Sequence, residues 1–222
     1  MDFEAEKLKA EQLEAAQALS DILGTNGIEH AIIGGFALRL LGHNRNTDNV
    51  DVEIDFSAIT RDQLTQLLTQ DDGRFTVEHY KLFFTPTSSD NKIMIETLPM
   101  GELGLPRQLR VLKLENSTIP ILHPAVLILA KAKRCAQLID STRPKSVVTF
   151  HSDLSDITFL LRWLEQRNEM IDFVGYQAAS VDRLYKAAVD LVKYWRQTEQ
   201  QDILDLMDSV LEPGDREKLM QD

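Results

Sequence analysis

The sequence contains very little cysteine. Cys135 is the single cysteine among 222 residues, so the chain cannot form an intramolecular disulfide, and Cys135 has no second cysteine with which to build a zinc site. A chain of this kind fits a reducing compartment, and we expect the protein in the cytoplasm.

Long apolar runs are missing as well. No run approaches the roughly 20 apolar residues that a transmembrane helix needs, and the N-terminal stretch MDFEAEKLKAEQLEAA is charged throughout. A secretory signal peptide would show a basic segment followed by an apolar one. We therefore expect a soluble protein that neither spans a membrane nor is secreted.

Basic residues are too few to balance the acidic ones. The chain has 24 Lys and Arg against 35 Asp and Glu, which gives a net charge of −11. Nonspecific binding to nucleic acid depends on Lys and Arg that neutralise phosphates, and an acidic field opposes it. The composition therefore argues against a nucleic-acid partner.

The first half of the chain predicts helices interspersed with short strands. An amphipathic pattern predicts a helix over residues 3–23, and a capping box at Thr60 and Gln63 predicts another over 61–70. A buried strand is expected over 28–33. Further strands are expected where apolar and β-branched residues lie between turn signals, over residues 75–79, 81–85, 92–98, 109–114 and 117–122.

The second half predicts helices only. Pro124 suits the first turn of a helix over residues 125–140, and a polar loop is expected over 141–148. Asp153 and Asp156 are favourable in a first turn and predict the start of a helix that runs to residue 167. Two more helices are expected over 180–197 and 201–211. The pattern places a boundary near Leu122, between an α/β domain (1–122) and a helical domain (123–222) packed against it.

The most informative stretch is residues 31–55, AIIGGFALRLLGHNRNTDNVDVEID. An apolar run ends at Gly34-Gly35, a short helical pattern follows, and a strand then places Asn49, Asp51 and Glu53 on one face. Backbone N–H groups at a glycine turn that opens a helix can hold a phosphate, and oxygen ligands beside them can hold its metal ion. An ordinary tight turn followed by a surface strand would show the same pattern.

This stretch resembles the signature of the polymerase-beta-like nucleotidyltransferase superfamily, in particular its small stand-alone members. The matching residues are Gly34, Gly35, Ala37, Gly42, Arg45, Thr47 and the strand Asn49-Val50-Asp51-Val52. The resemblance covers roughly residues 28–165. With the element order, it implies an α+β fold: a mixed, mostly antiparallel sheet flanked by helices, followed by a helical C-terminal half.

The resemblance also implies a reaction. It implies Mg²⁺-dependent transfer of a nucleoside monophosphate from a nucleoside triphosphate to an acceptor, and the acidic composition favours a small-molecule or protein acceptor. The residues that it implies for triphosphate binding are Gly34, Gly35, Arg45, Thr47 and, on the helix over 125–140, Lys133. Without the resemblance, Lys133 would be read as a solvated charge, and Arg45 as an ion-pair partner of Asp48 or Asp51.

The metal ligands of that superfamily are an Asp-x-Asp pair and a third carboxylate on a later strand. By position these correspond to Asn49, Asp51 and Glu96, and we take Asp51 and Glu96 as the catalytic carboxylates. Met94 and Leu98 beside Glu96 indicate a partly buried carboxylate, which either a metal ion or an arginine would satisfy.

Asn49 departs from the pattern, because its carbonyl can coordinate a cation but brings no charge and cannot act as a base. Three interpretations follow. Asn49 is a weaker ligand while Asp51 and Glu96 hold one metal ion well; the metal pair has moved to Asp51 and Glu53; or the site is degenerate. In the third case the chain binds a nucleotide or a protein partner as an antitoxin-like or regulatory component.

Overall fold

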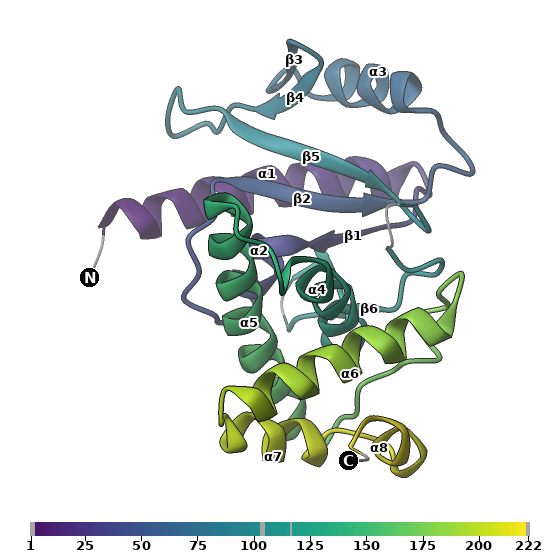
Figure 1. The fold of residues 1–222 in the computed structure, drawn as a ribbon. Coiled ribbons are helices and arrows are strands. Elements are labelled where there is room, and N and C mark those ends of the chain that lie inside the picture. Colours follow the sequence, from purple (N-terminus) through teal and green to yellow (C-terminus); the bar gives the residue numbers. More distant parts are fainter. Residues whose placement is uncertain (1–2, 103–104, 116, 221–222) are drawn as a thin grey trace. The chain divides into compact units, whose positions relative to one another are not determined.

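The computed structural model describes residues 3–102, 105–115 and 117–220, which form two compact units (Figure 1). Among the described residues, the first unit comprises 3–102, 111–115 and 117–122, and the second comprises 105–110 and 123–220. Residues 105–110, which precede the predicted boundary at Leu122, thus group with the second unit. Among the described helices, none is long and apolar enough to cross a membrane.

In its described residues, the first unit is a seven-stranded sheet with three helices. Its elements are α1 (Phe3–Thr25), β1 (His30–Ile33), α2 (Gly34–Leu40), β2 (Asn49–Ile54), α3 (Arg61–Asp71), β3 (Phe75–Glu78), β4 (Lys81–Phe84), β5 (Ile93–Pro99), β6 (Val111–Lys113) and β7 (Pro120–Leu122). The strand order is β3-β4-β5-β2-β1-β7-β6. Only the pairs β2–β5 and β1–β7 are parallel, so the predicted mixed, mostly antiparallel sheet is confirmed.

Strand β2 lies in the middle of this sheet, and its alternation decides which side chains face the core. Val50, Val52 and Ile54 are fully buried, while Asn49 and Asp51 on the opposite face are half-buried. Helix α1 contacts β1, β2 and β5 (Figure 1). The central strand therefore offers one apolar face to the core and one polar face to a site.

The described residues of the second unit form helices joined by loops and no strand, which confirms the predicted helical C-terminal half. It contains α4 (Pro124–Leu138), α5 (Pro144–Glu165), α6 (Val181–Gln197), α7 (Gln201–Ser209) and α8 (Pro213–Leu219). Helix α4 packs against α5 and α6. The helix α8 lies beyond the last predicted helix, and Pro213 occupies its first turn.

The start of α5 corrects two further predictions. The helix begins at Pro144, so most of the expected loop over 141–148 is helical. Asp153 and Asp156, which we expected at a helix start, lie within α5 and are fully buried. They are tolerated there because α4 supplies two cations. Lys131 Nζ lies 2.6 Å from Asp156 Oδ2 and 3.3 Å from Asp153 Oδ1, and Arg134 binds both oxygens of Asp153.

Removal of one partner from this buried group should be costly. Lys131→Met leaves Asp156 buried without its cation, and we expect the free energy of unfolding to fall by about 3–5 kcal/mol, measured by urea denaturation. The double variant Lys131→Met/Asp156→Leu removes both charges and should recover most of that loss. A Lys131→Met protein as stable as the wild type would show that the ion pair contributes nothing.

Candidate functional site

The site lies in the first unit, where the turn between β1 and α2 meets β2. Gly34 has φ +67°, a left-handed conformation that favours glycine. A Cβ atom at Gly34 would lie 1.9 Å from Oδ2 of Asp51. Glycine is therefore required for two reasons, and the Asp51 carboxylate lies directly against the turn.

The second glycine makes room for the segment that leads into β2. A Cβ atom at Gly35 would lie 2.9 Å from Cβ of Thr47 and 3.3 Å from Nε of Arg45. Both residues were predicted to bind a triphosphate together with the glycine pair. The structure thus brings Gly34, Gly35, Arg45, Thr47 and Asp51 together at one turn.

The predicted carboxylates meet through strand pairing. Because β2 and β5 pair in parallel, Asp51 lies opposite Glu96. The amide nitrogen of Asn49 donates hydrogen bonds to Asp51 Oδ1 at 2.6 Å and to Glu96 Oε2 at 3.3 Å. Its Oδ1 accepts from the Thr47 hydroxyl at 3.1 Å. Asn49 therefore connects the two carboxylates, and its orientation follows from its three partners.

Glu96 itself is exposed, which corrects the expectation of a partly buried carboxylate. Met94 and Leu98 share its face of β5, but both are themselves partly exposed. The cost of burying a charge is therefore small at Glu96. Its polar partner in the structure is the amide of Asn49.

The donor atoms gathered here fit a hard cation. The two carboxylates are the kind of ligand that Mg²⁺ takes, whereas the amide oxygen of Asn49 faces the Thr47 hydroxyl. One nitrogen atom already lies within hydrogen-bond distance of both carboxylates, so a single cation could contact both as well. Within the described part of the chain, no three side chains of His, Cys, Asp or Glu are placed to hold a metal ion. The site offers two carboxylates and a neutral amide.

Glu53 follows Asp51 on the same face of β2 but differs from it sharply. Its side chain is fully buried, and neither carboxylate oxygen has a hydrogen-bond partner among the described residues. Burial raises its pKa to about 8, despite an opposing effect of the Gly101 backbone. Glu53 is therefore mostly neutral at pH 7. No hydrogen bond in the described residues supports the interpretation in which Asp51 and Glu53 form the metal pair.

The pKa of Glu53 has a consequence for stability. The folded protein holds the Glu53 proton up to about pH 8, whereas the unfolded chain loses it near pH 4.5. The contribution of Glu53 to stability is thus fully present below pH 4.5 and declines as the pH rises to about 8. Gln at this position is neutral at every pH, so Glu53→Gln should be more stable than the wild type by a few kcal/mol at pH 9, at roughly 1.4 kcal/mol for each pKa unit.

Urea midpoints measured from pH 4 to pH 9 test this expectation. The matched control is Glu29→Gln, the same substitution at an exposed position. An identical pH dependence in the wild type and Glu53→Gln would contradict the assignment of a raised pKa to Glu53.

Lys133 lies in the second unit, on α4. It is half-buried, and its Nζ lies 5.3 Å from the centre of the Tyr176 ring. Burial and the charge of Arg183 lower its pKa. Lys133 is therefore not simply a solvated charge, and its contact with a triphosphate stays a prediction.

Sequence reasoning missed Gln12, a fully buried residue of α1. Its amide nitrogen donates to the backbone oxygens of Thr47 and Asn49, and its oxygen accepts from Arg39. The signal was in the helical spacing, because Gln12 lies one turn from Leu8 and from Ala16 and so belongs to the buried stripe. Leu13, the apolar residue next to Gln12, is 43% exposed.

Comparisons with known proteins bear on the fold. No protein-family model and no curated protein sequence matches the chain. Among solved structures, the chain is similar to an antigenic nucleotidyltransferase-like protein from Paracoccidioides brasiliensis, with a TM-score of 0.66 and 18% identity. The similarity covers 91% of this chain and 95% of that one.

Two weaker similarities have TM-scores below 0.5. One is to ANT(2")-Ia in complex with adenylyl-2"-tobramycin, with a TM-score of 0.42, 12% identity, and 71% of this chain and 98% of that chain covered. The other is to E. coli MS115-1 CdnC with ATP, with a TM-score of 0.34, 16% identity, and 90% and 68% covered. From the fold and the first similarity, the chain has a nucleotidyltransferase-like fold.

Proposed function

We propose that this chain binds a nucleoside triphosphate with Mg²⁺ and transfers the nucleoside monophosphate to a small-molecule or protein acceptor. The observation that carries the proposal is the meeting of Asp51 and Glu96 on neighbouring parallel strands, directly beside the Gly34 turn. The net charge of −11 favours such an acceptor over RNA.

Each residue at the turn has a role in this proposal. Gly34 and Gly35 form the turn that opens α2, where backbone N–H groups can bind phosphate oxygens. The guanidinium of Arg45 and the hydroxyl of Thr47 can bind phosphate oxygens. Asp51 and Glu96 would hold Mg²⁺, and the carbonyl of Asn49 would join them once the amide turned over, because its nitrogen now faces the two carboxylates. When bound, Mg²⁺ supplies positive charge that stabilises the attacking and leaving oxygens of a phosphoryl group.

A second candidate function is nucleotide or partner binding without transfer. It is favoured by the hydrogen bonds of Asn49, which satisfy both carboxylates with a neutral donor. An aspartate at this position would repel Asp51 and Glu96 unless a cation lay between them. The neutral amide of Asn49 removes the need for such a cation. Compared with aspartate, it also provides one negative charge fewer for a site with two metal ions.

Nucleotide titration tests the binding step that both candidates share. We expect at least one of the four common nucleoside triphosphates to bind in isothermal titration with Mg²⁺ and to bind more weakly without it. Asp51→Asn keeps the shape of the side chain but removes its charge, and should weaken Mg²⁺-dependent binding by about tenfold or more. Asp48→Asn, an exposed neighbour, is the matched control. Failure of all four triphosphates to bind would overturn the transferase proposal.

Restoration of the missing carboxylate separates the two candidates. In a weak transferase, Asn49→Asp should raise Mg²⁺-dependent release of pyrophosphate about tenfold or more, because it adds charge stabilisation at the reacting phosphate. Without divalent cations the same variant should have a lower Tm, since three carboxylates then repel one another. Asn44→Asp, at an exposed position, is the control. Activity that stays at background in Asn49→Asp would favour binding without transfer.

A further inference from the structure

Gln12 lies in α1, far from the site in sequence, yet all its hydrogen bonds lead toward the site. Its Nε2 donates to the backbone oxygens of Thr47 at 2.9 Å and Asn49 at 3.1 Å, and its Oε1 accepts from Arg39 Nη1 at 3.0 Å. A reversed amide would set its oxygen against two carbonyl oxygens, so this orientation is the one that its partners allow. Gln12 therefore holds the segment before β2 against α2.

The residues that Gln12 holds are those that orient the carboxylates. The Thr47 hydroxyl donates to the side chain of Asn49, whose amide donates in turn to Asp51 and Glu96. Because Gln12 binds the backbone of Thr47 and Asn49, it acts on the carboxylates without contacting them. Arg39, its other partner, lies on the helix that begins at Gly34.

Helix α1 also binds the segment that leads into β5. Glu11, which is 2% exposed, accepts hydrogen bonds from the Ser89 hydroxyl at 2.7 Å and the Asn91 amide at 3.4 Å. Glu14 accepts from Thr87 N at 3.1 Å and from Arg74 Nη1 at 2.7 Å. Residues 87–91 lie between β4 and β5, and Glu96 follows on β5. One helix thus binds the approaches to both strands that carry the site.

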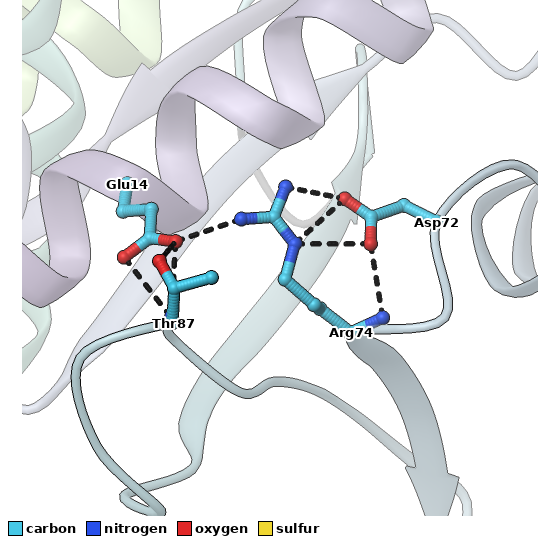
Figure 2. A network of polar contacts seen from close by, with 4 residues as sticks. All are labelled: Glu14, Asp72, Arg74 and Thr87. Atoms are coloured by element: carbon cyan, nitrogen blue, oxygen red, sulfur yellow. Dashed lines mark hydrogen bonds and ion pairs between the residues drawn. The ribbon is translucent and has the colours of Figure 1, made fainter.

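Figure 2 shows the Glu14 part of this arrangement. Arg74 lies between Glu14 and Asp72, and Thr87 lies against the Glu14 carboxylate. Burial alone would raise the pKa of Glu14, but the hydrogen bonds from Thr87 and the charge of Arg74 lower it below its ordinary value. Glu14 is therefore held in its charged form at neutral pH.

We propose that Gln12 is a positioning residue for metal-dependent nucleotide binding: it sets the backbone of Thr47 and Asn49, and thereby the separation of Asp51 and Glu96. The inference rests on the proposed function, since it needs a cation at these two carboxylates. Loss of Gln12 should weaken the binding of the cation, whereas the glycine turn should still bind the nucleotide alone.

The test compares Gln12→Met with Gln17→Met. Both substitutions keep the length of the side chain and lie on α1, but Gln17 donates to Asp21 on the same helix and to the hydroxyl of Thr118, and not to the segment that leads into β2. The measurements are the Kd of Mn²⁺ alone, followed by electron paramagnetic resonance, and the Kd of ATP with and without Mg²⁺, followed by calorimetry. Circular dichroism and Tm establish that each variant is folded.

For Gln12→Met we expect the Kd values of Mn²⁺ and of Mg²⁺-ATP to rise about tenfold or more, as for other residues that orient metal ligands. The Kd of ATP without metal should change little, and Gln17→Met should match the wild type. The contrast between metal-bound and metal-free ATP is the decisive readout, because a general loss of stability would affect both alike.

The outcomes separate the two proposals. Two results overturn the positioning role of Gln12 and leave the proposed function standing. In one, the wild type binds Mn²⁺ and Mg²⁺-ATP and Gln12→Met binds them equally well. In the other, Gln12→Met loses affinity for ATP equally with and without metal. A wild-type chain that binds neither overturns the proposed function and, with it, this inference. If Gln12→Met does not fold, Gln12→Glu decides, because it keeps an acceptor for Arg39 but loses both donors; it should show the same selective loss.

Discussion

The parallel pairing of β2 with β5 is the constraint on which the site depends. Asp51 and Glu96 are neighbours only because this pairing sets them opposite each other. A shift of one residue would turn Glu96 to the other face of the sheet. Parallel neighbours need a long connection, and here the connection contains α3, β3 and β4. Strands β3 and β4 extend the sheet beyond β5 and so secure the strand that carries Glu96.

The polar face of β2 carries less charge than its sequence indicates. Asn49 is neutral by chemistry, and Glu53 is mostly neutral at pH 7 because it is buried. Asp51 therefore meets a single strong acidic neighbour, Glu96, across the strand pair. A face with this charge suits one divalent cation better than two, since each additional ion requires more negative charge from its ligands. Under the proposed function, Asp51 and Glu96 would hold a single metal ion.

The fold could be predicted because its signals are local. Alternation in β2, the capping box at Thr60 and the helical spacing after Pro124 each identify an element from a few neighbouring residues. The strand partners of β2, by contrast, depend on contacts between residues far apart in the chain. The meeting of Asp51 with Glu96 was expected from the family resemblance, not from any local pattern.

Burial was the harder property to predict. Periodicity assigns a residue to a face, but it does not say what covers that face. Glu53 shares a face with Asp51 and was expected beside a metal ion, yet it is fully buried. Asp153 and Asp156 have the composition of a helix start, but cations from another helix allow them to lie inside one. Gln12 occupies an apolar stripe because backbone oxygens of a distant segment satisfy it.

The hydrogen bonds of α1 also bear on the order in which the molecule folds. Gln12 binds a residue 37 positions away, and Glu11 binds one 78 positions away. Contacts that span such distances cost loop-closure entropy and form after local structure. The helices and hairpins can form early, and the pairing of β2 with β5 makes the two carboxylates neighbours. The segments that lead into these strands are held in place only when the contacts with α1 are made. Partial unfolding that releases α1 would therefore loosen the segments before β2 and β5 while the strand pair itself remained intact.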